Sequence, residues 1–239
     1  MADVTIDTIL NNEYKICQPK NGFRFSLDSV LLVRFVKKKN INNALDIGAG
    51  SGVISLLLHK IHQFQNIDAL EYQQSMYYCL NKTIELNQCK NVIKPVREDI
   101  KSFRPEKRYD FMISNPPYRK INTGKVCNST DENIARFDTE MNIYDIFRFS
   151  NSFLENSGSL YISYDADLTE NLLANCRNFN LEPKRIMFFH PDIDKPAKLV
   201  FVEFKKSAKI ELRVEPPIFQ KINGKNNKNF DKLFTDEEA

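Results

Sequence analysis

The sequence predicts a doubly wound α/β domain, in which helices cover both faces of a mostly parallel sheet. Short apolar runs alternate with helical patterns from about residue 43 to about residue 205, as is typical of parallel sheets. A chain of 239 residues, 42% of them apolar, is long enough to bury such a core. Glycines at 48, 50 and 52 follow the first apolar run, where a parallel strand turns into its helix.

The core elements are expected to alternate along the chain without internal repeats. Apolar runs predict strands at 44–47, 67–70, 92–96, 109–114, 159–164, 185–189 and 199–205. Apolar residues at helical spacing predict helices at 52–62, 73–87, 143–154 and 169–178. The stretch 119–138 is polar and has no periodicity, so we expect a long surface loop there.

Shorter elements flank this core. Ahead of it we expect a strand at 13–17 and a helix at 27–36, with Ser26 as its N-cap and Asp28 in its first turn. After it, residues 210–234 are expected to add a strand and a closing helix. The predicted organisation is an N-terminal extension at 1–42 that packs on the core, a core at 43–206, and a C-terminal extension of the same domain at 207–239.

Composition narrows the class of protein. The net charge of +3 is only mildly basic, so charge alone is weak evidence for a nucleic-acid ligand. The five cysteines are dispersed and form no CxxC pair, which favours reduced thiols over a disulfide framework or a zinc site. No apolar run approaches the ~18 residues of a membrane span, and the first residues do not resemble a signal peptide. We therefore expect a cytoplasmic protein with no membrane partner and no metal.

The most specific motif is Asn115-Pro116-Pro117-Tyr118, which directly follows the strand predicted at 109–114. Two prolines fix φ at about −65° and have no N–H, so the Asn115 amide oxygen and the Pro116 carbonyl can accept hydrogen bonds from one incoming amino group. Tyr118 adds a flat ring for stacking. A planar NH2 group held in this way keeps its lone pair free for in-line attack on a methyl donor, and no acid or base is required.

The turn after the first strand reads Asp46-Ile47-Gly48-Ala49-Gly50-Ser51-Gly52. The dinucleotide fingerprint GxGxxG requires a glycine where this chain has Val53, so the turn favours an adenosyl cofactor without a pyrophosphate. A plain tight turn between strand and helix stays open as the alternative.

Two further acidic positions follow the next strands. Glu71 ends the second strand and can accept from both hydroxyls of a ribose, while Tyr72 can cover an adenine face. Asp99 follows the third strand as an acceptor for an adenine amino group, with Ile100 as an apolar wall. Taken singly, Glu71 can be a solvated acid and Asp99 a turn residue. Together with Asn115 they lie at the carboxyl ends of successive strands, where open α/β sheets bind ligands.

With these motifs the chain resembles class I S-adenosylmethionine-dependent methyltransferases that modify amino groups at an Asn-Pro-Pro-Tyr motif, and among them the bacterial tRNA(Val) adenine-37 N6-methyltransferases. The resemblance spans about residues 13–206. It includes residues 18–32 (Gln-Pro-Lys-Asn-Gly-Phe-Arg-Phe-Ser-Leu-Asp-Ser-Val-Leu-Leu), 133–137 (Asn-Ile-Ala-Arg-Phe) and 196–203 (Pro-Ala-Lys-Leu-Val-Phe-Val-Glu).

The resemblance implies a Rossmann-like sheet of seven strands with an antiparallel last strand, S-adenosyl-L-methionine as the cofactor, and methylation of N6 of a flipped adenine in the anticodon loop of a tRNA. Asn115 to Tyr118 would hold the base. The residues that would hold the cofactor are Asp46, Gly48, Ala49, Gly50, Gly52, Glu71, Tyr72, Asp99 and Ile100, with Phe25, Ser26 and Asp28 at its methionine end. The residues that would contact RNA are Lys20, Arg24, Arg119, Lys120, Lys125, Arg136 and Phe137, the basic ones through phosphates.

Other readings stay open. Any single lysine or arginine of this set can simply be solvated. The same chemistry can act on another RNA, such as ribosomal RNA, or on a glutamine side chain of a release factor, which also presents a planar NH2 group. A DNA adenine methyltransferase normally carries an added recognition domain, and a non-catalytic RNA-binding scaffold has no chemical need for these residues together. The oligomeric state is not determined by the sequence.

Overall fold

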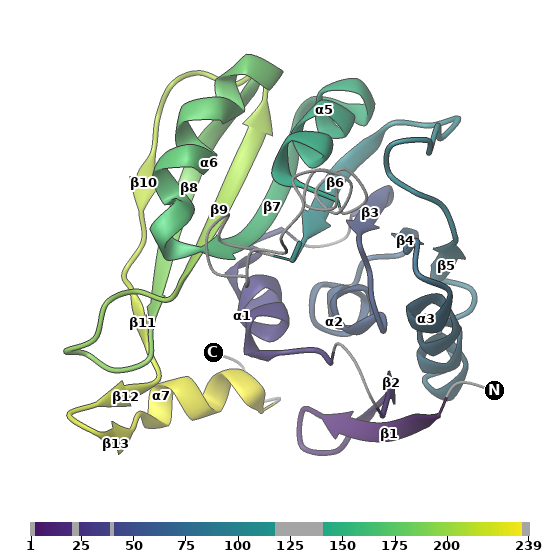
Figure 1. The fold of residues 1–239 in the computed structure, drawn as a ribbon, viewed down its shortest axis with the longest axis horizontal. Coiled ribbons are helices and arrows are strands. Elements are labelled where there is room, and N and C mark those ends of the chain that lie inside the picture. Colours follow the sequence, from purple (N-terminus) through teal and green to yellow (C-terminus); the bar gives the residue numbers. More distant parts are fainter. Residues whose placement is uncertain (1–2, 21–23, 39–40, 118–140, 236–239) are drawn as a thin grey trace, which may run out of the picture.

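The computed structural model describes residues 3–20, 24–38, 41–117 and 141–235 (Figure 1). Its centre is a sheet with strand order β10-β8-β9-β7-β6-β3-β4-β5, and the short β11 also pairs with β8. The strands of this sheet are β3 (Ala44–Ile47), β4 (Ile67–Leu70), β5 (Ile93–Val96), β6 (Tyr109–Ser114), β7 (Leu154–Asp165), β8 (Leu181–His190), β9 (Leu199–Lys206), β10 (Arg213–Val214) and β11 (Ile218–Phe219). None of the helices in the described ranges has the length and apolar content needed to span a lipid bilayer.

The pairing confirms the predicted sheet. Strands β3 to β7 pair in parallel, whereas β9 lies antiparallel between β7 and β8. Seven longer strands form the body of the sheet, and the two-residue strands β10 and β11 extend it beyond β8. Two strands begin earlier than predicted. In β7, Leu154 pairs with Tyr109 ahead of an irregularity that precedes Ser159. In β8, Leu181 pairs with Lys206, and the polar Glu182 also joins the ladder.

Helices cover both faces of the sheet. They are α1 (Leu27–Phe35), α2 (Val53–His62) and α3 (Gln74–Leu86) on one face, and α5 (Ile143–Phe153) and α6 (Thr169–Cys176) on the other. Successive residues of a strand point to opposite faces, so Phe111 and Ile113 of β6 pack under α1 and α2 while Met112 packs under α5. The doubly wound arrangement expected from the sequence is therefore present.

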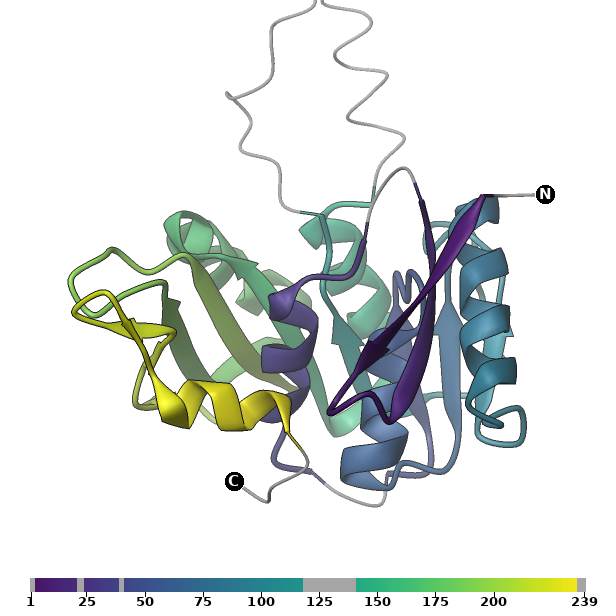
Figure 2. The same cartoon turned by 90° about the horizontal axis from the view of Figure 1, so that it is seen from below.

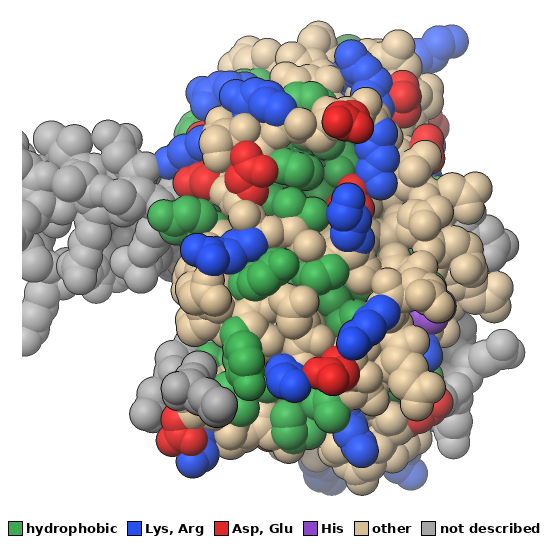
Figure 3. Space-filling model, turned by 90° about the vertical axis from the view of Figure 1, so that its right-hand side faces the viewer, with side chains coloured by type: hydrophobic (Ala, Val, Ile, Leu, Met, Phe, Trp, Pro, Cys, Tyr) green, Lys and Arg blue, Asp and Glu red, His purple; other side chains and the backbone are tan. Residues whose placement is uncertain are grey.

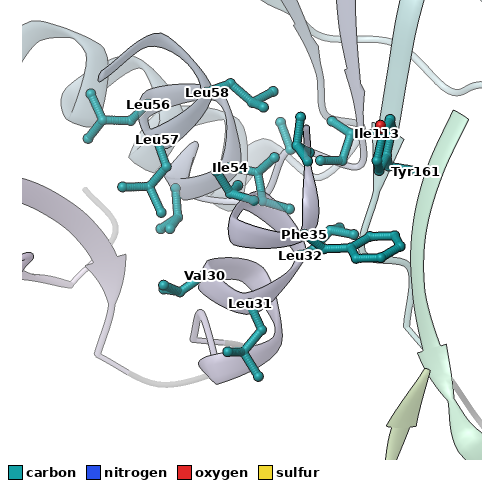
Figure 4. Close-up of a cluster of buried hydrophobic side chains, with 14 of the residues drawn as sticks. Val30, Leu31, Leu32, Phe35, Ile54, Leu56, Leu57, Leu58, Ile113 and Tyr161 are labelled. Atoms are coloured by element: carbon teal, nitrogen blue, oxygen red, sulfur yellow. The ribbon is translucent and has the colours of Figure 1, made fainter. Parts of the chain in front are cut away.

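Helix α1 is embedded in the core rather than laid on it. Its Leu31 and Leu32 are fully buried, and Phe35 approaches Tyr161 of β7 edge to face, with ring centroids 5.9 Å apart. Figure 4 shows these α1 side chains together with the leucines of α2 and with Ile113 of β6. The position of α1 is thus fixed by the same apolar contacts that fix the sheet.

A hairpin of β1 (Val4–Ile9) and β2 (Tyr14–Pro19) precedes α1 and packs on α3, where the Cys17 N–H donates to Thr83 Oγ1 at 3.0 Å. The sequence predicted β2 but not β1, whose residues are half exposed. The predicted cap of α1 is wrong in its chemistry, because Ser26 stands at the N-cap but its hydroxyl donates to the Asp28 carboxylate instead of accepting from the first turn.

The tail returns to α1. After β10 and β11 it forms the hairpin of β12 (Lys221–Ile222) and β13 (Lys225–Asn226), and then α7 (Lys228–Asp231) and the 3-10 turn η3 (Lys232–Phe234). The Arg34 guanidinium donates to the carbonyls of Leu233 at 3.0 Å and Thr235 at 2.7 Å. Figure 2 shows α7 beside α1. The expected strand and closing helix are present, with three more short strands than predicted.

A buried charge network joins the tail, the sheet and α1. Arg185 of β8 donates to Glu215 at 2.8 Å, to Glu203 of β9 at 3.0 Å and to the Phe35 carbonyl at 3.2 Å. Lys37 also donates to Glu215, at 2.9 Å. Hydrogen bonds from Lys37 and Arg185 lower the pKa of Glu215 to about 2.

The lowered pKa of Glu215 predicts an acid-dependent loss of stability. The carboxylate stabilises the folded state above its ordinary pKa of 4.5, and this contribution is lost as the pH falls from there toward 2. Glu215→Gln should therefore unfold at lower urea concentration than the parent at pH 7, and the two free energies of unfolding should converge toward pH 3. Glu211→Gln, a change at an exposed ion pair with Lys184, is the control. A constant difference between Glu215→Gln and the parent across this range would contradict the prediction.

Candidate active site

The turn between β3 and α2 brings bare backbone to the carboxyl end of the sheet. Gly48 and Gly52 have φ of +72° and +85°, which residues with side chains rarely adopt. A Cβ at Gly48 would come within 2.9 Å of Met141 Cε, and one at Gly52 within 2.7 Å of Leu80 Cδ1. Both positions therefore need glycine for the turn itself, which is the alternative that the sequence left open.

Asp46 stabilises this turn by hydrogen bonds with Ser55. Its Oδ2 accepts from the backbone N–H of Ser55 at 3.1 Å and from the Ser55 hydroxyl at 2.7 Å, which ties the end of β3 to the first turn of α2. The side chain is fully buried, and Oδ1 has no hydrogen-bond partner among the described residues. Burial raises the pKa of Asp46 to about 7, against the opposing effect of the Ser55 hydrogen bonds.

Glu71 ends β4 and faces the same turn. Its Oε2 accepts from the Gly50 N–H at 2.9 Å, and its Oε1 accepts from the Gln73 N–H at 2.7 Å. Glu71 is only 7% exposed, and this burial raises the pKa of its carboxyl group. Since each carboxylate oxygen can accept more than one hydrogen bond, both can also receive a donor from a ligand.

A cavity of about 350 Å³ lies over the carboxyl ends of β3, β4, β5 and β6. The predicted residues that line it are Gly48, Gly50, Glu71, Tyr72, Asp99, Ile100, Asn115 and Pro117. Asp99 also fulfils its alternative role as a turn residue, because its Oδ1 accepts from the Lys101 N–H at 2.9 Å. Tyr72 is 63% exposed, so its ring stands at the rim.

A second, smaller pocket of about 30 Å³ adjoins this cavity and shares Gly48, Gly50 and Asn115 with it. Phe25 and Ala49, two of the predicted cofactor-binding residues, line it. Ser29 lines it too, and its Oγ accepts from Asn115 Nδ2 at 3.2 Å. This bond orients the Asn115 amide between the two spaces.

Several predicted residues lie away from these spaces. Neither space is lined by Asp46, Gly52, Ser26, Asp28 or Pro116. Asp46 turns toward Ser55, and the Ser26 hydroxyl donates to Asp28. Pro116 is buried.

Of the residues predicted to contact RNA, the structure describes only Lys20 and Arg24. Lys20 pairs with Asp3 at 2.7 Å, and Arg24 pairs with Asp7 and donates to Thr5 at 3.1 Å. The others, together with the stacking residue of the motif, lie outside the described residues: Tyr118, Arg119, Lys120, Lys125, Arg136 and Phe137.

The sequence did not predict several residues that line the two spaces. Among them are Met76, Met141 and Gln73 in the larger cavity and Ser29 in the smaller pocket. The methionines carry no motif and resemble core residues. Ser29 lies in the first turn of the predicted helix, next to the predicted residues Phe25, Ser26 and Asp28, and carries no motif of its own. Among the described residues, no group of three or more His, Cys, Asp or Glu side chains is arranged to hold a metal ion.

The raised pKa of Asp46 predicts that stability falls as the pH rises. The folded state keeps the proton up to about pH 7, whereas the unfolded chain loses it near the ordinary pKa of 3.8, so the folded state binds more protons between these values. Asp46→Asn retains an acceptor for Ser55 and cannot ionise. Its free energy of unfolding, measured by urea titrations between pH 4.5 and pH 8.5, should rise relative to that of the parent by about 1 kcal/mol or more toward the alkaline end.

The exposed Asp194→Asn makes the same change of side chain at a solvated position and is the control for Asp46→Asn. The control and the parent should show equal pH slopes. If Asp46→Asn also follows the parent slope, the buried carboxyl does not titrate near neutral pH.

Known proteins with similar sequences are methyltransferases. Residues 24–176 match the family model of the methyltransferase small domain. A tRNA1(Val) (adenine(37)-N6)-methyltransferase of Parabacteroides distasonis is 25% identical over 212 residues, which cover 85% of this chain and 88% of the relative. A protein of the same name from Histophilus somni is 26% identical over 178 residues, 73% of this chain and 75% of the relative.

Solved structures share the fold. A "predicted O-methyltransferase" from Agrobacterium tumefaciens matches with a TM-score of 0.67 at 18% identity, over 87% of this chain and 95% of its own. TYW2 of M. jannaschii, solved in complex with AdoMet, matches with a TM-score of 0.54 at 16% identity, over 86% and 88% of the two chains. The predicted Rossmann-like methyltransferase fold is therefore confirmed. Since the family model spans well over half of the sequence, the chain belongs to the methyltransferase small domain family.

Proposed function

We propose that this chain is an S-adenosyl-L-methionine-dependent methyltransferase that acts on N6 of an adenine in RNA, with adenine 37 in the anticodon loop of tRNA(Val) as the favoured target. The observation that carries the proposal is the position of Asn115, which follows β6 and lines both the larger cavity and the smaller pocket. The names of the curated relatives, which cover most of this chain, support the target.

The residues around the larger cavity fit the cofactor. Its volume of about 350 Å³ lies in the range of small-molecule sites. Glu71 would hold the ribose hydroxyls, since both of its oxygens face the turn and can accept further donors. Asp99 would accept from the adenine amino group, and Ile100 would cover the ring. S-adenosyl-L-methionine supplies an activated methyl group on a sulfonium.

The backbone of Gly48 and Gly50 would lie against the middle of the cofactor, because no side chain separates it from either space. Phe25 and Ser29 would border the methionine end in the smaller pocket. Asp46 would act indirectly, by holding the turn through Ser55.

Asn115 and the prolines would position the base. The bond from Asn115 to Ser29 sets the plane of the amide, and Pro116, which is buried, fixes the backbone that follows. An adenine amino group that donates to the Asn115 amide oxygen and the Pro116 carbonyl would present its nitrogen lone pair to the methyl group. Transfer to this nitrogen would form a C–N bond as the C–S bond of the donor breaks, and the nitrogen would then release a proton to solvent, so the chain need not supply a general base. An unpaired loop nucleotide reaches the site at lower cost than a base inside a duplex.

Transfer of a labelled methyl group tests the proposal. The enzyme and methyl-labelled S-adenosyl-L-methionine are incubated with total RNA from cells that lack this enzyme, and the labelled nucleosides are identified. Label in N6-methyladenosine of the tRNA fraction is the expected result. Label that appears only when a release factor replaces the RNA, or no label despite cofactor binding, would contradict it.

Asn115→Ala should separate positioning from cofactor binding. The variant loses an orienting acceptor at the transferred group, so methyl transfer should slow by about 10²- to 10³-fold while cofactor affinity by calorimetry stays within about twofold. Asn171→Ala, an exposed asparagine of α6, is the control. Turnover of Asn115→Ala equal to that of the control would remove the proposed role of this residue.

A further inference from the structure

The β5 edge of the sheet carries a large open groove outside the candidate active site. Strand β5 pairs only with β4 among the described strands, so it ends the sheet on this side. The groove has a volume of about 1100 Å³ and is lined by residues of the segments 66–68, 90–97 and 103–109. We call it the β5 groove. Figure 3 shows this face of the molecule, on which Lys and Arg side chains, with a smaller number of Asp and Glu side chains among them, lie around apolar ones.

The β5 groove is strongly cationic. Five of its lining residues are basic and two are acidic, a net of +3 that equals the net charge of the whole chain. The basic residues are Lys90, Lys94, Arg97, Arg104 and Lys107. One of the acids, Asp68, is buried and already accepts from the Tyr109 hydroxyl at 2.7 Å and from Lys107 at 2.9 Å.

Most of these cations form no ion pair within the described protein. No ion pair between described residues includes Lys94, Arg97 or Arg104. Lys90 forms no close ion pair either, although its charge contributes to the lowered pKa of Glu85. Lys20 contrasts with them, because it pairs with Asp3. Exposed cations gathered in one concave surface create a potential that attracts an extended anion.

The edge itself does not suit a further strand. Pro95 lies within β5 and has no N–H for a neighbouring strand, and Lys94 beside it is a charged residue of the kind that blocks edge pairing. A partner that adds a strand is therefore disfavoured. A sugar-phosphate backbone binds without strand pairing, and its negative charge is complementary to the positive charge of the groove.

Consecutive residues after β5 line first the groove and then the larger cavity of the candidate active site. Arg97 lines the groove, and the next residues, Glu98, Asp99 and Ile100, line the larger cavity. An RNA that places a loop base at Asn115 thus has cationic surface available beyond the cavity, along β5.

We propose that the β5 groove binds the sugar-phosphate backbone of the tRNA outside the anticodon loop, while the loop itself enters the active site. This inference rests on the proposed function for the identity of the RNA. The groove contributes affinity and positioning by phosphate contacts, which carry no sequence information.

The test compares two triple variants that remove equal charge from different faces. Lys94→Gln/Arg97→Gln/Arg104→Gln alters the groove, and Lys221→Gln/Lys225→Gln/Lys228→Gln alters exposed lysines of the C-terminal hairpin and α7. Binding of an unmodified tRNA(Val) transcript is followed by fluorescence anisotropy over a series of salt concentrations, and thermal unfolding checks that both variants fold.

The groove variant should bind tRNA about tenfold or more weakly than the parent, and the slope of log K against log salt should fall by about 2 to 3. In methyl transfer, KM for tRNA should rise while kcat at saturating tRNA stays unchanged. The hairpin variant should behave like the parent in all of these measurements.

Equal tRNA affinity and equal salt slopes for the two triple variants would overturn the inference. The direct binding measurement also separates it from the proposed function. If the parent binds tRNA through the groove but transfers no methyl group, the proposed function fails and the groove assignment stands.

Discussion

The buried carboxyl of Asp46 is the contact on which the arrangement of the site depends. By accepting two hydrogen bonds from Ser55, it joins the central strand β3 to the start of α2 and holds the glycine turn between them. The Gly50 N–H of that turn then donates to Glu71 at the end of β4. Because β3 lies between β4 and β6, the carboxyl ends of the neighbouring strands surround one turn.

The site is completed by a segment that precedes the glycine turn. Helix α1 is anchored by buried apolar side chains and by the donation from Arg185 to the Phe35 carbonyl. It places Ser29 against Asn115, which comes from β6. The N-terminal segment therefore lines the candidate site, and the orientation of the motif asparagine depends on how α1 packs.

Much of this arrangement could be predicted from the sequence, because buried parallel strands leave a clear record. The runs at 44–47, 67–70 and 109–114 were placed at their observed bounds, and their carboxyl ends located Glu71 and Asn115. Features that depend on tertiary packing could not be predicted: the direction in which Asp46 turns, the bond to Ser29, and the methionines at the cavity. Strand β1 was missed because its half-exposed residues give no buried pattern, and the predicted Ser26 cap fails because the Asp28 carboxylate competes for the hydroxyl.

The contacts of α1 also bear on when the site forms during synthesis. Arg34 donates to the carbonyl of Leu233, 199 residues further along the chain. The Phe35 carbonyl accepts from Arg185, 150 residues further on. Contacts of such long sequence separation form late, after the segments between them have been ordered. A growing chain that has already made its glycine turn and its Asn-Pro-Pro-Tyr motif therefore lacks the final support of α1, and the site reaches its full order only once the tail has left the ribosome.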